Sequence, residues 1–225
     1  MGEKVTFPSS AHTCEGYLAT TALGKGPAVV VIQEWWGLVP HVMDVCDRFA
    51  KEGFVAAAPD LFHGQTANAP DQAGRLAMEL DVERANAEVA GAAEYVLSRP
   101  ECSSTSFGVV GFCMGGALAQ VASTTNAKVG AAVSFYGGFN KIQVRWENLA
   151  APILLIYGEL DEGVPASGAA PLEKRLKELG KNAETRIYRG APHGFFNDSR
   201  PTQYREECAR DAWNRTVALL RTHVR

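Results

Sequence analysis

The sequence predicts an α/β fold in which a mostly parallel central sheet carries helices on both faces. Short apolar runs alternate with longer amphipathic segments along most of the 225 residues, an alternation typical of strands joined by crossover helices. The run at 28–33 opens with five apolar residues, four of them β-branched, as expected for a strand buried on both faces. Because no repeat, low-complexity tract or Pro/Gly/Ser-rich linker interrupts the pattern, we expect a single domain over residues 1–225.

The remaining elements follow from the same periodicities. An apolar face at 41–53, closed by Gly53, predicts a helix, and Pro59 ends a short strand at 54–58. The alanine-rich region at 71–98 is expected to be helical. Further strands are predicted at 106–112, 130–136, 153–157 and 184–188, and further helices at 114–123, 171–179 and 201–221. Ligands of such sheets bind beyond the carboxyl ends of the strands, where the functional residues are therefore expected.

The composition excludes several classes of function. Hydrophobic residues make up 46% and charged residues 21% of the chain, with a net charge of -3, as in ordinary globular proteins. There is no basic stripe for nucleic acid and no apolar run that would serve as a leader or a membrane span. The 5 cysteines are dispersed and form no CxxC motif, so we expect reduced thiols, a cytoplasmic location and no metal site. We also expect a monomer.

The hexapeptide GFCMGG at 111–116 joins a predicted strand to a predicted helix. A nucleophile on a sharp strand-to-helix turn needs small residues two positions before and two after it, and Gly111 and Gly115 meet that need around Cys113. The helix dipole at this position favours thiolate over thiol. An inert cysteine in a close-packed junction is the alternative, whereas a phosphate-binding loop would need spacing that is absent here.

A cysteine nucleophile needs a base, and the base needs an orienting carboxylate. His193 lies in a loop of small residues directly after the last predicted strand. Asp161 lies in a turn just past another strand, with Glu159 and Glu162 as chemically similar neighbours. The order nucleophile, acid, histidine is the order of α/β-hydrolases, so the loops together predict a catalytic triad on an α/β-hydrolase fold.

The remaining histidines have simpler interpretations. His12 and His223 lie near the chain ends and are expected to be solvated. His41 begins a helix, where capping or surface exposure explains it. His63 follows a strand and is expected to hydrogen-bond a loop backbone. None of these predictions assigns the residue to catalysis.

With these residues in view, the chain resembles the dienelactone hydrolase family of α/β-hydrolases over nearly its whole length. The resemblance implies Cys113 as the nucleophile, Asp161 as the orienting acid and His193 as the base, which selects Asp161 over its glutamate neighbours. A GxCxGG elbow beside a QE-aromatic-aromatic-G segment is a specific combination. The segments that carry the resemblance are VIQEWWGL (31–38), APDLFHG (58–64), GFCMGGALA (111–119), YGELD (157–161) and APHGF (191–195).

The same resemblance implies roles for residues around the nucleophile. The backbone N–H groups of Trp35 and Met114 would bind the developing oxyanion. Glu34 would contact the resting thiol and keep it uncharged, since a nearby carboxylate disfavours a thiolate. Trp35 and Phe195 flank these positions and are expected to line an apolar pocket, whereas Trp36, Tyr136 and Phe196 are assigned no pocket role.

Members of this family that act on dienelactone hold its carboxylate with two arginines. Arg75 or Arg84 would supply the first in this chain. The second is expected shortly after the catalytic histidine, where Asn197 stands and Arg200 follows three residues later. The carboxylate clamp implied by the resemblance is therefore incomplete at the second position.

The resemblance implies a hydrolase that cleaves small lactones or activated esters through a Cys113 thioester, without cofactor or metal. The expected partner is the small-molecule ester or lactone substrate, with no nucleic acid and no membrane. One alternative is a broad carboxylesterase or thioesterase with the same mechanism. The other is a catalytically idle scaffold whose Cys113 senses oxidants.

Overall fold

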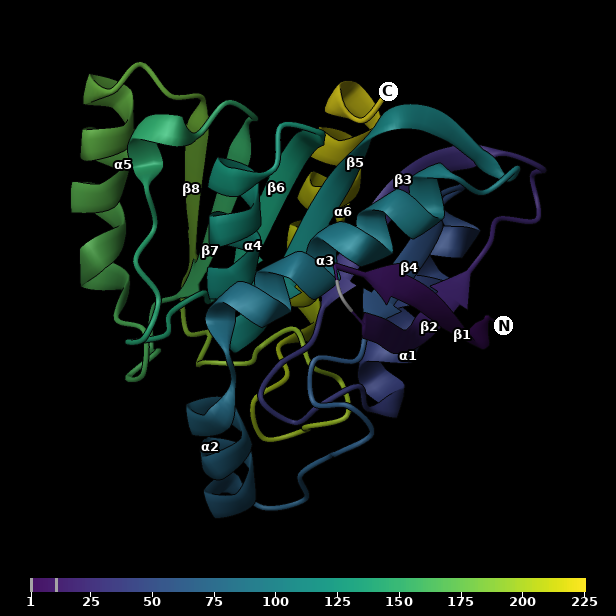
Figure 1. Cartoon of the computed structure of the whole chain (residues 1–225). Helices are drawn as coiled ribbons and strands as arrows, with labels where there is room; N and C mark the ends of the chain where they lie inside the picture. The colour runs from purple at the N-terminus through teal and green to yellow at the C-terminus, as the bar shows by residue number, and fades with distance from the viewer. Residues whose placement is uncertain (1, 11) are drawn as a thin grey trace.

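The computed structural model describes residues 2–10 and 12–225, and these residues form one eight-stranded sheet in the order β1-β2-β4-β3-β5-β6-β7-β8 (Figure 1). β4, β3, β5, β6, β7 and β8 run parallel, whereas β1 and β2 pair antiparallel. This confirms the predicted mostly parallel sheet. The strands are β1 (Glu3–Ser9), β2 (His12–Ala19), β3 (Gly26–Ile32), β4 (Val55–Pro59), β5 (Cys102–Phe112), β6 (Val129–Phe135), β7 (Ile153–Gly158) and β8 (Ala183–Tyr188).

Helices cover both faces of the sheet, as expected from the alternating pattern. Val30 and Ile32 of β3 pack in the core beneath α3, α4 and α5, while Val29 and Val31 pack in the core beneath α1 and α6. Side chains of one strand therefore supply both cores in alternation. The helices are α1 (Pro40–Lys51), α2 (Pro70–Glu79), α3 (Val82–Leu97), α4 (Met114–Thr125), α5 (Ala169–Glu178) and α6 (Glu206–His223), with short 3-10 turns η1 (Trp146–Asn148) and η2 (Ala166–Gly168).

The structure differs from the expected elements mainly at the two ends of the chain. β1 and β2 form an N-terminal hairpin that the sequence pattern did not predict. The closing helix α6 begins at Glu206, because residues 201–203 form a turn and the next two residues are not helical, in place of the helical turn expected from 201. Between α2 and α3 the helical region breaks at Leu80, and the Asp81 side chain caps α3 by accepting the backbone N–H groups of Glu83 and Arg84.

The parallel strands end at one edge of the sheet, at the bottom of Figure 1, where α2 stands beside the loops that follow them. The loops after β3, β5, β7 and β8 contain the segments singled out by the sequence motifs. Among the helices of residues 2–10 and 12–225, none has the length and apolar character needed to cross a bilayer.

Candidate active site

Cys113 lies on a strained turn between β5 and α4. Its backbone adopts φ 54° and ψ -118°, a region that costs about 1–3 kcal/mol for a residue with a Cβ. The turn brings strand and helix backbones so close that a Cβ at Gly111 would collide with the carbonyl oxygen of Gly115. A Cβ at Gly115 would likewise collide with the carbonyl oxygen of Ile32 in β3. The half-buried Cys113 is thus held by its neighbours in the geometry expected of a nucleophile elbow.

His193 and Asp161 form a hydrogen-bonded pair beside Cys113. The Nδ1 atom of His193 lies 2.7 Å from Oδ2 of Asp161, whose side chain is fully buried. The other Asp161 oxygen accepts backbone N–H groups from Gly163 at 2.9 Å and Val164 at 2.8 Å. These bonds fix the carboxylate, and the carboxylate fixes the orientation of the imidazole. The structure therefore brings together the residues assigned to the triad, while Glu159 instead accepts the backbone N–H of Gly190.

The electrostatics of the pair favour a charged His193. Burial by itself lowers the pKa of His193, but hydrogen bonding to Asp161 and to Cys113 raises it more, from 6.5 to about 10. Because the neighbouring groups that raise this pKa are the carboxylate and the thiol, the imidazole is well suited to take a proton from Cys113.

A cavity of about 480 Å³ opens at this point, and Cys113 and His193 both line it. Trp35 and Met114 line the same cavity, as expected for residues whose backbone N–H groups would bind an oxyanion. Within residues 2–10 and 12–225, neither of these N–H groups has a hydrogen-bond acceptor. Met114 is the first residue of α4, so its N–H is one of those that a helix leaves unpaired.

Glu34 is buried beside the cavity, and both of its carboxylate oxygens are occupied. Oε1 accepts the hydroxyl of Tyr136 at 3.2 Å, and Oε2 accepts the side-chain amide of Asn197 at 2.8 Å. The aromatic ring of Tyr136 also lies 4.8 Å from the imidazole of His193, between their centroids. Burial, followed by the Glu34 carboxylate, raises the pKa of Tyr136 well above its usual value, so its hydroxyl keeps its proton and donates.

Comparisons with known proteins identify the family of this chain. The family model described as the dienelactone hydrolase family matches residues 14–224. The chain belongs to the dienelactone hydrolase family. "Protein usf" of Aquifex pyrophilus is 37% identical, and a "Putative carboxymethylenebutenolidase" of Aquifex aeolicus is 35% identical, each over 100% of both chains. A crystal structure described as a "Putative Dienelactone Hydrolase" from Klebsiella pneumoniae has a TM-score of 0.89 at 27% identity, covering 99% of both chains.

In this dienelactone hydrolase family member, the loop after β3 and the start of α1 are fastened to the loop that carries His193. Asn197 binds Glu34, Asp198 Oδ1 lies 3.1 Å from Nδ1 of the buried His41, and the Arg200 guanidinium lies 3.5 Å from the ring centroid of Trp36. We call these contacts the loop clamp. His41 is therefore itself buried and paired with the half-exposed Asp198, contrary to the capping or exposed role expected for it. The clamp connects the segment of Trp35 to the segment of His193.

Sequence reasoning did not single out Tyr136 or the contact that Asn197 makes. Tyr136 follows β6 directly, at the same sheet edge as the other candidates, and its φ of 39° is unusual for a residue with a side chain. Its place as the last residue of the strand predicted at 130–136, at the carboxyl end of the sheet, was the available signal. From the sequence, Asn197 was considered only as the residue that stands where an arginine was expected. Its bond to Glu34 gave no sequence signal, because the two residues are 163 positions apart.

The structure does not bring two of the expected pocket residues to the cavity. Phe195 is fully buried and packs its ring against Tyr136 and Tyr188, in the core beneath α6. Arg75 is exposed on α2 and is not among the residues that line the cavity. Arg84 lies on α3, where its guanidinium donates to Glu88.

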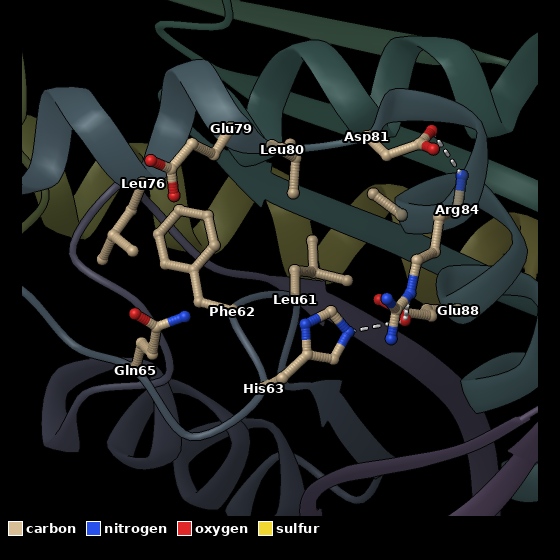
Figure 2. A pocket seen from close by; sticks show the side chains of 11 residues that line it. Leu61, Phe62, His63, Gln65, Leu76, Glu79, Leu80, Asp81, Arg84 and Glu88 are labelled. Carbon is tan, nitrogen blue, oxygen red and sulfur yellow. Dashed lines mark hydrogen bonds and ion pairs between the residues drawn. The ribbon is translucent and has the colours of Figure 1, made fainter.

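Arg84 and Glu88 line a second cavity, of about 220 Å³, between the loop after β4 and the junction of α2 with α3 (Figure 2). Oε1 of the buried Glu88 lies 2.8 Å from Nε2 of His63, 2.9 Å from Nε2 of His12 and 2.9 Å from Nε of Arg84. The backbone partner expected for His63 and the solvated state expected for His12 are therefore wrong. Cys113 and His193 do not line this cavity, so it is separate from the candidate active site.

Proposed function

We propose that this protein is a carboxylic-ester hydrolase in which Cys113 is the nucleophile, His193 the base and Asp161 the group that orients the base. The observation that carries the proposal is the pairing, in one cavity, of a strained Cys113 with a His193 whose Nδ1 is held by Asp161. Membership of the dienelactone hydrolase family supports ester bonds as the target.

In the first half of the proposed reaction, His193 Nε2 takes the thiol proton while the Cys113 sulfur forms a bond to the ester carbonyl carbon. The carbonyl π electrons move to oxygen, and the backbone N–H groups of Trp35 and Met114 stabilise that oxyanion. One such donor contributes about 3–4 kcal/mol to a hydrolase transition state. The oxyanion collapses, the C–O bond breaks, and the leaving alkoxide takes the proton from His193.

In the second half, the thioester is hydrolysed. His193 takes a proton from a water molecule whose oxygen attacks the thioester carbonyl carbon, and the same N–H groups bind the second oxyanion. Collapse breaks the C–S bond and releases the carboxylic acid, and His193 returns its proton to the sulfur. Thiolate is a far better leaving group than an amine, so reactive esters and lactones suit this mechanism better than amides.

The test is steady-state hydrolysis of p-nitrophenyl acetate and of a dienelactone by the wild type, Cys113→Ala, Cys113→Ser and His193→Ala. We expect turnover of p-nitrophenyl acetate by the wild type and a loss of about 10³-fold or more of that activity for Cys113→Ala and His193→Ala. Electrospray mass spectrometry of quenched reactions should detect the acyl adduct on Cys113.

Two results would contradict the proposal. Full activity in Cys113→Ala would exclude the sulfur as the nucleophile. One equivalent of product followed by no turnover would favour the reading of Cys113 as a covalent sensor.

A further inference from the structure

The cavity at Cys113 is polar only at its reactive end. Away from Cys113 and His193, the side chains that form its wall are hydrophobic: Trp35, Ala77, Met78, Met114, Phe139 and Val164. Its volume of about 480 Å³ lies in the range of small-molecule sites. Among the described residues that line it, none is an arginine or a lysine. An ionised group on the acyl chain would lose hydration against this apolar wall without gaining an arginine or lysine as a partner.

The nearby polar and cationic side chains are engaged in other contacts. Arg200 stacks on Trp36, and Asn197 donates its amide to Glu34. The ammonium group of Lys141 donates to the backbone carbonyl oxygen of Met78, at the end of α2. Arg75, one of the two arginines that the family resemblance offered for binding a substrate carboxylate, is exposed on α2 outside the lining.

From these observations we infer that the protein selects neutral esters with an apolar acyl group and discriminates against esters whose acyl group carries a carboxylate. The inference rests on the proposed function, since it names the substrate class of the same site. The apolar wall binds the acyl chain, and Cys113 and His193 meet its carbonyl group. Because no arginine or lysine stands among the described residues of the lining, an anionic acyl group finds no cationic partner along the wall that binds the chain.

The decisive comparison uses p-nitrophenyl valerate and mono-p-nitrophenyl glutarate. Their acyl chains are the same except at the end, where the valerate has a methyl group and the glutarate has a carboxylate. We expect kcat/KM for the valerate to exceed that for the glutarate by at least about tenfold. Across acetate, butyrate and valerate, kcat/KM should rise by up to about fourfold for each added methylene. Equal or faster hydrolysis of the glutarate would overturn the inference while leaving the hydrolase mechanism intact.

Substitutions at Met78 test whether the wall sets this preference. Met78 lies on α2 and is 64% exposed, so arginine is readily accommodated there. Met78→Arg should lower the ratio of kcat/KM for the valerate to kcat/KM for the glutarate by about fivefold or more. Added salt should reverse part of that change. Met78→Gln, similar in length but uncharged, should keep the ratio above tenfold.

Arg75 and Lys141 are the cations whose action would contradict the inference. If Arg75→Gln or Lys141→Gln lowers glutarate hydrolysis about tenfold and leaves valerate hydrolysis unchanged, that side chain binds the carboxylate and the inference is wrong. We expect each variant to change the two rates by the same factor.

A readout without turnover separates failure of this inference from failure of the proposed function. In modification by an alkyl methanethiosulfonate, the Cys113 thiolate forms a disulfide and methanesulfinate leaves. Propyl methanethiosulfonate should modify Cys113 at least about tenfold faster than 2-carboxyethyl methanethiosulfonate, after division by their rates with glutathione. A preference for the carboxyethyl reagent, measured by peptide mass spectrometry at Cys113, would overturn the inference even if no ester were hydrolysed.

Discussion

At the scale of single residues, the site depends on how Asp161 is bound. One oxygen accepts two backbone N–H groups, and the other holds Nδ1 of His193. The first oxygen fixes the carboxylate without help from solvent. The second leaves Nε2 of His193 as the ring nitrogen that faces a substrate.

Asp161→Asn separates these two tasks. The amide oxygen retains the backbone bonds from Gly163 and Val164, but the NH₂ group faces Nδ1 and favours the wrong tautomer of His193. We expect kcat/KM for p-nitrophenyl esters to fall by about 10²-fold or more, while the melting temperature changes by only a few degrees. Unchanged activity in a folded variant would show that Asp161 does not orient His193.

The raised pKa of His193 also predicts a pH dependence of stability. A group whose pKa is higher in the folded than in the unfolded protein stabilises the fold while it is protonated. For His193 this stabilisation is complete at pH values below its ordinary pKa of 6.5, and it disappears as the pH rises toward its pKa in the folded protein, about 10. The difference in unfolding free energy between the wild type and His193→Gln should therefore be largest near pH 6 and shrink steadily up to pH 10. Urea titrations at several pH values measure it, and a difference independent of pH would contradict the prediction.

At the scale of elements, the contact between β5, α4 and β3 decides whether Cys113 is presented at all. Gly111 and Gly115 stand where main chains meet, so the turn exists because these residues lack a Cβ. The loop clamp adds a second constraint, since Asn197, Asp198 and Arg200 hold the loop of His193 against the loop of Trp35. Together they set the distance between base, nucleophile and oxyanion donors.

Two helical glycines provide a matched test of the elbow. At Gly115 an added Cβ would collide with carbonyl oxygens at the end of β3, whereas at Gly74 of α2 it would meet nothing within 4 Å. Gly115→Ala should destabilise the protein by at least about 1–3 kcal/mol. Gly74→Ala should stabilise it by about 0.5–1 kcal/mol through helix propensity. Equal effects in urea denaturation would show that close approach at Gly115 is not required.

At the scale of the whole molecule, buried Glu88 connects segments distant in sequence. Its Oε1 meets His12 of β2, His63 of the loop after β4 and Arg84 of α3 itself. The N-terminal hairpin is thereby fastened to the layer that covers the sheet. The contact lies away from the candidate active site, so it bears on stability and not on chemistry.

Glu88→Ala and Glu94→Ala compare a buried with an exposed carboxylate on the same helix. Glu94 pairs with Lys128, but both side chains are half exposed, and such pairs contribute less than about 1 kcal/mol. Removing Glu88 leaves several donors without their common acceptor, and we expect a loss of about 1–3 kcal/mol. Similar losses in both variants, measured by denaturation, would contradict a fastening role for Glu88.

Local patterns were sufficient to predict the parallel sheet and most of its helices, because apolar periodicity and glycine placement are properties of short segments. Strands β3 to β8 and the position of Cys113 between β5 and α4 follow from such patterns. The N-terminal hairpin was not predicted, because its strands mix polar and apolar residues and are defined by pairing with each other and with β4.

The sequence by itself determined the fold class, the family and the residues proposed for the triad, because each of these residues lies in a short motif that directly follows a predicted strand. Only the tertiary structure decided which side chains surround them. It placed Tyr136 and Asn197 on Glu34, kept Arg75 and Phe195 out of the cavity, and joined His12 to His63 through Glu88. These contacts join residues far apart along the chain, and folding alone sets the distance and burial on which their energies depend.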